Sequence, residues 1–315
     1  MSVLFFENKY YPSAKTGPRF DEDIGFHHEH GVAFQNEDAF FARSLNHGGD
    51  PHYLQIPAGT SITLRNWVEK SFGDSNPVES DYVPGTFYKR MWRPMGLGYN
   101  TTASPEKLTQ SFVSLRILLN KLEDLFETLE PTESNLLAYG HKVRELILLA
   151  CMEVESGWCA VLKENGYRSG IWTTKDYIKL RKPMCLDAYE LSLQQYPKFP
   201  SFSPFKDWEE QKPTKSLVWY DAYNEIKHDR EENLKLATLQ NAVLAVGAAV
   251  VIFYSQYGSN LGPFTHDQKI PLIRSVFKTS VGFERYEREF YIPKLVLPLN
   301  SAFPVWTAIN YPFQY

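Results

Sequence analysis

Polar side chains gather over three turns of one predicted helix, and they are Tyr220, Tyr223, Asn224, Lys227, His228 and Arg230. At 100° per residue, Asn224 and His228 stand one turn apart on one face of that helix. Glu231 and Glu232 continue this face. The neighbouring face carries Tyr223, Lys227 and Arg230, so one helix surface presents an imidazole, an amide and two cations.

These residue types are suited to binding a phosphate and to acid–base chemistry. An imidazole titrates near neutral pH, so His228 is predicted to act as a general acid or base. Lys227 and Arg230 are predicted to stabilise negative charge that develops during a reaction. With His228 they form the predicted catalytic set, and Tyr223 and Asn224 are predicted to contact the ligand.

A structural role is the alternative for the same residues. Charged residues on a helix are commonly solvated, and His228 and Asn224 would then be hydrogen-bonded to a neighbouring loop. Bonds to the chain itself favour this structural interpretation, whereas an open cleft favours ligand binding.

Two charged residues of the preceding predicted helix accompany this surface. Arg144 and Glu155 are 11 residues apart, about three turns, and therefore share a face. Because charges beside an apolar stretch need solvent or partners, we expect them to pair with charged side chains of the helix that carries His228. Both are also candidate ligand-binding residues.

Other chemical signatures are weak or absent. The run His-His-Glu-His at residues 27–30 lacks the ligand spacing of a zinc site, so no metal and no cofactor are predicted. The sequence has no G-x-x-x-x-G-K-S/T loop, no G-x-G-x-x-G after a strand and no G-x-S-x-G. A nucleotide triphosphatase, a nicotinamide dehydrogenase and a serine hydrolase are therefore not expected.

Helical periodicity dominates the middle of the chain. It begins at Ser104-Pro105, where serine is a predicted N-cap and proline occupies the first helical position. Apolar residues recur at three- and four-residue spacing up to Pro131, and a second helix is predicted from there to Asn165. The site-bearing helix is predicted to run from Lys215 to Tyr257, and its second half is apolar and therefore buried.

The ends of the chain favour strands and loops. Residues 53–67 contain two alternating runs around a Pro-Ala-Gly-Thr turn, which predicts a β-hairpin. Further segments are predicted as strands, with a helical turn as the alternative for the first: 171–180, 188–196, 283–297 and 304–311. The predicted fold is mainly α, with a helical bundle core at 104–258 and β-rich additions at 1–103 and 259–315, α+β overall.

Charge and hydropathy restrict the class of partner. The formal net charge is −4 and the pI about 6.1, so no global basic surface indicates nucleic-acid binding. The longest apolar run, residues 242–254, is shorter than the ~20 residues of a membrane span, and no membrane association is expected. Three cysteines without a C-x-x-C pair favour a reducing compartment, and we expect a cytoplasmic protein.

The stretch W-Y-D-A-Y-N-E-I-K-H-D-R, following the two predicted helices, resembles the HEPN-like proteins of bacteria. Its Y-N-x-x-K-H-x-R pattern, Tyr223 to Arg230, is similar to a helix of uncharacterised branches of that superfamily, and the resemblance covers about residues 105–257. It implies an all-helical bundle that forms a homodimer through the helix carrying His228. It also implies RNA binding or metal-independent RNA cleavage, in a toxin–antitoxin or defence system.

The order of the polar residues differs from that of the HEPN-like ribonucleases. Those carry an Arg followed, a few residues later, by a His, whereas here His228 precedes Arg230. The first hypothesis is therefore an RNA- or nucleotide-phosphate-binding protein with a degenerate ribonuclease site, and whether it is an enzyme stays open. The rival is a non-catalytic structural or dimerisation protein. A metal-dependent hydrolase using the histidines of residues 27–30 ranks last.

Overall fold

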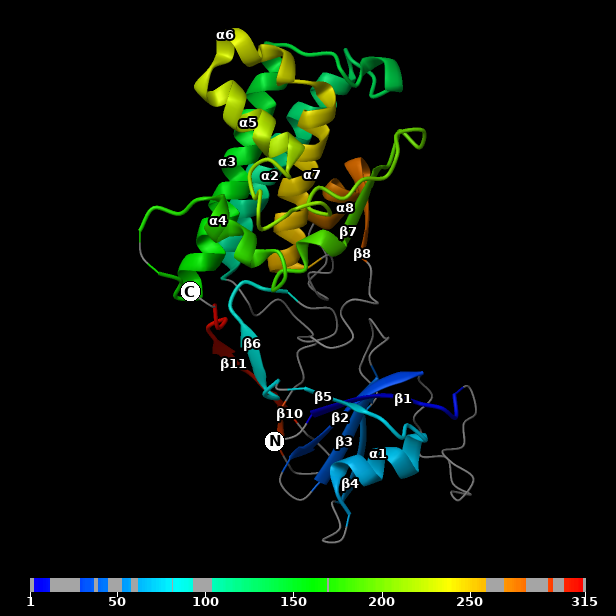
Figure 1. Cartoon of the computed structure of the whole chain (residues 1–315). Helices are drawn as coiled ribbons and strands as arrows, with labels where there is room; N and C mark the ends of the chain where they lie inside the picture. The colour runs from blue at the N-terminus through cyan, green and yellow to red at the C-terminus, as the bar shows by residue number, and fades with distance from the viewer. Residues whose placement is uncertain are drawn as a thin grey trace. The chain divides into compact units, whose positions relative to one another are not determined.

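The computed structural model describes residues 3–11, 29–36, 39–44, 53–57, 62–80, 82–92, 104–168, 170–258, 269–281, 294–296 and 303–313 (Figure 1). The chain forms two compact units. The sheet unit comprises Met1–Phe87, Arg93–Gly98 and Glu284–Ala308, and the helical unit comprises Tyr88–Trp92, Tyr99–Phe283 and Ile309–Tyr315. The predicted fold class is confirmed, since a helix-dominated core is combined with β structure.

The sheet unit is built on a five-stranded antiparallel sheet of order β4-β3-β2-β1-β5. Its strands are β1 (Val3–Glu7), β2 (His30–Asn36), β3 (Ala39–Ser44), β4 (Tyr53–Pro57) and β5 (Val78–Ser80). Helix α1 (Leu64–Phe72) contacts β1 and β2 and shares a core with the sheet. That core contains Leu4, Phe6, Ala33, Phe40, Ala42, Leu64, Trp67, Val68 and Phe72.

The hairpin predicted for residues 53–67 is wrong in its second half, because Leu64 begins α1. Thr63 is the N-cap, and its hydroxyl accepts a hydrogen bond of 3.2 Å from the backbone N–H of Asn66. Gly73 ends the helix with a positive φ of 73°, a conformation in which glycine avoids the steric cost of a Cβ. Local capping therefore outweighs the alternating apolar pattern.

The helical unit contains two long helices and several shorter ones around a buried one. Its helices are α2 (Pro105–Phe126), α3 (His141–Glu164), α4 (Thr174–Tyr177), α5 (Val218–His228), α6 (Arg230–Asn233), α7 (Leu239–Tyr257) and α8 (Lys269–Val276). Short 3-10 helices occupy Glu133–Asn135, Ile178–Leu180, Leu186–Ala188 and Leu234–Leu236. Ser104 caps α2 as predicted, since its hydroxyl accepts from the backbone N–H of Lys107, and Pro105 is the first helical residue.

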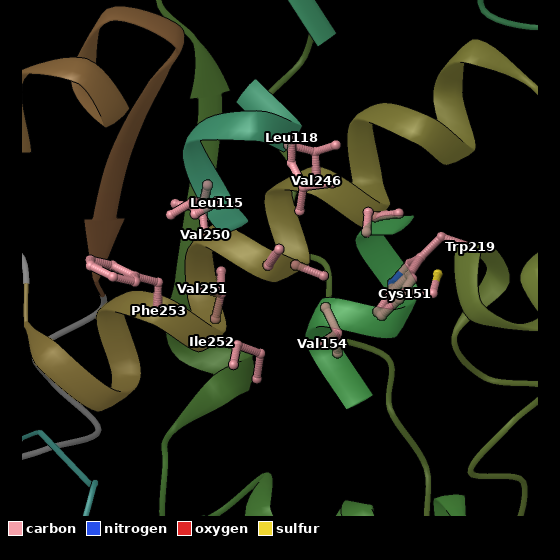
Figure 2. Packing of buried hydrophobic residues seen from close by; sticks show 14 of the residues in the cluster. Leu115, Leu118, Cys151, Val154, Trp219, Val246, Val250, Val251, Ile252 and Phe253 are labelled. Atoms are coloured by element: carbon pink, nitrogen blue, oxygen red, sulfur yellow. The ribbon is translucent and has the colours of Figure 1, made fainter. Parts of the chain in front are cut away.

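Helix α7 is the centre of this unit. All but two of its residues are buried, and it contacts α2, α3 and α5. Figure 2 shows Val246, Val250 and Phe253 of α7 among side chains of α2, α3 and α5. By length and composition α7 is the one helix of the described residues that is suited to cross a membrane, but 89% of its apolar window is buried inside the fold.

The single helix predicted from Lys215 to Tyr257 is broken twice. Asp229 has extended backbone angles, and its carboxylate caps α6 by accepting from the N–H of Glu232. Thr238 caps α7 in the same way through the N–H of Asn241. The side chains of Asp and Thr accept hydrogen bonds from backbone N–H groups at the start of a helix. They therefore begin new helices where apolar periodicity alone predicts one continuous helix.

Strands also accompany the helices. Within the predicted strand 188–196 the structure has β7 (Tyr189–Leu193), which pairs antiparallel with β8 (Phe277–Val281). Residues 171–180 adopt the helical alternative, as α4 and the following 3-10 turn. Of the remaining short strands, β6 (Thr86–Tyr88) pairs with β11 (Thr307–Ile309), and β9 (Lys294–Val296) pairs with β10 (Phe303–Val305) in the sheet unit. Residues 283–293 and 297 of the predicted strand 283–297 lie outside the described residues.

Candidate functional site at the end of α5

The predicted site lies on α5 and on the part of α3 that packs against it. Arg144 in the first turn of α3 contacts Ile226 near the end of α5. Glu155, three turns further along α3, contacts Tyr220 near the start of α5. The two helices therefore run antiparallel, and the first turn of α3 lies beside the last turn of α5.

One face of α5 is tied to α3 by a short hydrogen bond. The hydroxyl of Tyr220 donates to Glu155 Oε1 over 2.5 Å, and Tyr220 is buried. Burial raises the pKa of Tyr220 far above its usual value, and the hydrogen bond to Glu155 adds to the shift. The phenol therefore stays protonated and serves as the donor that a half-buried carboxylate requires.

Tyr223 and Lys227 form a second pair, one turn apart on α5. Lys227 Nζ donates to the hydroxyl of Tyr223 over 3.1 Å and lies 5.0 Å from the centre of the ring. Burial raises the pKa of Tyr223, whereas the hydrogen bond to Tyr223 raises the pKa of Lys227. At neutral pH the pair is an ammonium group on a neutral phenol, an arrangement that holds a cation at the helix surface.

Asn224 and Arg144 also have partners within the chain. Asn224 Nδ2 donates to the carbonyl oxygen of Tyr220 on its own helix over 2.9 Å. Arg144 Nη2 donates to the carbonyl oxygen of Ile226 over 3.4 Å, where a cation favours the negative end of the α5 dipole. Arg144 and Glu155 do reach α5 as expected, but their partners are a carbonyl and a tyrosine rather than charged side chains.

The predicted histidine–arginine surface is not continuous. His228 is the last residue of α5 and is exposed. Arg230 begins α6 beyond the extended Asp229, so Arg230, Glu231 and Glu232 do not continue the faces of α5. The placement of His228 and Arg230 on one helix surface is therefore wrong, because it assumed an unbroken helix. Arg230 is described only as the first residue of the α6 backbone.

The end of the unit near His228 carries further exposed polar groups. His141 and Lys142 are exposed in the first turn of α3, and that turn contains no acidic residue. The N-cap residue Gly140 has no side chain, so no side-chain hydrogen bond caps the backbone N–H groups at the start of this 24-residue helix. Tyr139, just before them, is 58% exposed. The N-terminus of a long helix favours negative charge.

Two carboxylates of α3 and α5 are paired with lysines. Glu145 accepts from Lys121 Nζ over 2.8 Å, and this contact lowers the pKa of Glu145. Glu225 accepts from Lys215 Nζ over 3.1 Å.

A second polar network was not predicted from the sequence. Arg90 donates to Gln256, Glu164 and the hydroxyl of Tyr257, which belong to α7 and α3. In the sequence Arg90 stands in a proline- and glycine-rich connection with no periodic pattern. Its only sequence signal is a basic residue close to the start of the helical region, which is too common to indicate a site.

No metal site was predicted, and only part of the histidine run at residues 27–30 is described. His30 lies on β2, with Glu29 just before it, and His27 and His28 lie outside the described residues. Over the ranges that the structure describes, no three His, Cys, Asp or Glu side chains come together as metal ligands.

No family model, no curated protein and no solved structure matches this chain.

Proposed function

We propose that this chain is a HEPN-like helical protein that binds RNA, or another ligand bearing phosphates, at the end of the helical unit where α3 begins and α5 ends. The observation that carries the proposal is the convergence there of four exposed basic or titratable side chains with an uncapped helix N-terminus. These side chains are His141, Lys142, Lys227 and His228.

Each part of this surface favours a phosphate for a separate reason. Lysines neutralise phosphate charge and release counterions, which dominates the affinity of proteins for nucleic acids. Backbone N–H groups at the start of α3 add donors without adding sequence preference. The exposed ring of Tyr139 offers a face on which an unpaired base stacks.

The proposed role is binding rather than cleavage. A general acid or base must lie within hydrogen-bond reach of the group it acts on, together with a charge stabiliser. His228 is separated from Arg230 by the extended Asp229, and Asn224 and Arg144 are engaged with α5 itself. A degenerate ribonuclease site is consistent with these positions.

RNA binding is tested by fluorescence anisotropy with a labelled single-stranded oligonucleotide. Lys142→Ala and Lys227→Ala are each expected to weaken binding several-fold and to reduce the salt dependence by about one phosphate contact. Lys163→Ala is the matched control, because Lys163 is exposed on the same helix about 32 Å from Lys142. Equal losses in all three variants, or no binding by the wild type, contradict the proposal.

Ribonuclease activity is tested separately. Purified protein incubated with the same oligonucleotide is expected to leave it intact, in the wild type and in His228→Ala alike. Cleavage by the wild type that His228→Ala abolishes would instead establish a ribonuclease.

A second candidate is a non-catalytic interaction protein that forms a homodimer at this end. It is favoured by Leu137 and Tyr139, which are 72% and 58% exposed and lie directly before α3. A second copy would remove this apolar surface from water. Light scattering after size exclusion tests the candidate: a dimeric mass that Leu137→Ser converts to a monomer supports it, and a wild-type monomer rejects it.

A further inference from the structure

A polar cavity of about 410 Å³ opens between α2, α3 and α7, within the helical unit and away from the end of α5. Small residues leave this space where the helices approach: Gly157 and Ala160 on α3 and Ala249 on α7. The volume lies within the range of pockets that hold small-molecule ligands.

One wall is formed by a buried guanidinium. The side chain of Arg90 is 8% exposed. It donates to Gln256 Oε1 over 2.9 Å, to Glu164 Oε1 over 3.1 Å and to the hydroxyl of Tyr257 over 2.8 Å. A guanidinium has five N–H donors, so two remain for a further acceptor at the cavity.

The backbone of Arg90 is strained in order to hold this position. Its φ is +55°, and in the described chain only Cys185 is another non-glycine residue with a positive φ. An L-residue with a side chain is disfavoured in the left-handed region, and such strain is concentrated at ligand-binding and catalytic sites. The hydrogen bonds from Arg90 to α3 and α7 hold the residue in this backbone conformation.

Lys107 brings a second cation to the same wall. Its Nζ lies 2.6 Å from Glu164 Oε1, the oxygen that also accepts from Arg90. A single carboxylate thus faces two cations, and Lys107 lies in the first turn of α2, where the helix dipole is positive. Arg90 and Lys107 thus share one carboxylate, that of Glu164.

The remaining polar wall favours hydrogen bonding to an uncharged part of a ligand. Ser111, Ser114 and Ser156 contribute hydroxyl groups, and Gln110 contributes an amide. Glu153 lies among them; burial raises the pKa of its carboxyl, while Ser114 and Arg90 oppose the shift. The cavity therefore combines two cations with hydroxyl, amide and carboxyl groups.

We propose that this cavity binds a small metabolite through one anionic group, a phosphate or a carboxylate, which Arg90 and Lys107 hold while the serine hydroxyls contact the rest of the molecule. The site is independent of the RNA surface at the end of α5.

The experiment compares two lysines of α2 that each pair with a glutamate of α3, one at the cavity and one away from it. Lys107 pairs with Glu164 at the cavity, and Lys121 pairs with Glu145 about 21 Å further along the helix. Thermal unfolding of the full chain is measured with millimolar inorganic phosphate or acetate against chloride at constant ionic strength. Phosphate, acetate or both are expected to raise the melting temperature of wild type and Lys121→Gln but not of Lys107→Gln.

Titration calorimetry with the stabilising anion then gives affinities. Lys107→Gln is expected to weaken binding at least about tenfold, as is usual for loss of a charge-assisted contact, and Arg90→Gln at least as much if it folds. Stabilisation by phosphate alone assigns a phosphate group, and stabilisation by acetate alone assigns a carboxylate. No stabilisation by either anion, or equal stabilisation of Lys107→Gln and Lys121→Gln, overturns the proposal.

Discussion

Tyr220 and Glu155 join α5 to α3 through one hydrogen bond of 2.5 Å. Tyr220→Phe removes the donor, leaves the half-buried carboxylate without it, and is expected to lower the free energy of unfolding by about 1–3 kcal/mol. Tyr139→Phe is the control, because Tyr139 is 58% exposed and its change should stay within about 0.5 kcal/mol. Urea denaturation measures both, and an equal effect of the two substitutions would contradict the role of the bond.

Tyr254 gives a prediction for alkaline pH. Burial raises its pKa from 10.0 to about 12, although Arg274 opposes the shift. In the unfolded chain the phenol ionises near pH 10, so the unfolded state loses its proton first and stability falls between about pH 10 and 12. Tyr254→Phe is expected to reduce the slope of stability against pH there, by up to about 1.4 kcal/mol per pH unit. Urea titrations at several pH values test it, and identical slopes would disprove it.

At the residue scale, spacing predicted which side chains lie on α5 but not where each one is directed. Tyr223, Asn224 and Lys227 are on α5. The side chain of Asn224 turns back to the carbonyl oxygen of Tyr220. This direction depends on the rotamer of Asn224, which residue spacing does not predict. The network around Arg90 was missed for a related reason, because residues more than 70 positions apart form it.

At the element scale, the start of α2 was predicted from its cap, whereas the second predicted helix begins at His141 rather than directly after Pro131. Ser104-Pro105 marked the start of α2 correctly. The breaks at Asp229 and Thr238 were missed, although both residue types are common N-caps, because the apolar pattern was given more weight. Residues 64–67 were assigned to a β-hairpin for the same reason, with Thr63 and Gly73 as the overlooked signals of a helix.

The approach of α3 to α7 depends on Gly157. A Cβ at this position would lie 2.4 Å from Ile252 Cγ2, which is closer than real contacts allow. Gly157→Ala should therefore destabilise the protein by about 1–3 kcal/mol, although alanine is the better helix former.

Gly140→Ala provides the matched control for this substitution. A Cβ there meets nothing within 4 Å, and the φ of 170° is extended backbone that any residue adopts. The midpoint of thermal unfolding should fall for Gly157→Ala only. A Gly157→Ala variant as stable as wild type would show that the two helices separate without cost.

At the scale of the whole molecule, the two units have separate hydrophobic cores. Phe72 is fully buried in the sheet unit and stacks on Phe6 with ring centroids 4.2 Å apart. Phe72→Ala should cost about 3–5 kcal/mol and accelerate amide exchange in β1, β2, β3 and α1. Peptides from α3 and α7 should keep their wild-type exchange.

The reciprocal variant completes this test. Leu119→Ala, at a fully buried position of α2, should accelerate exchange in α2, α3 and α7 and spare β1–β3. Hydrogen exchange with mass spectrometry measures the amide exchange of both variants. Uniform acceleration over the whole chain by either one would indicate a single cooperative unit.

The burial of α7 has a consequence for synthesis of the protein. A 19-residue apolar helix that emerged from the ribosome alone would present the cell with a segment resembling a membrane anchor. Here α2, α3 and α5 precede α7 in the chain, so the surfaces that cover it are already made when it appears. Because domains generally fold as units during translation, this order shortens the time for which α7 is open to chaperones or to the insertion machinery.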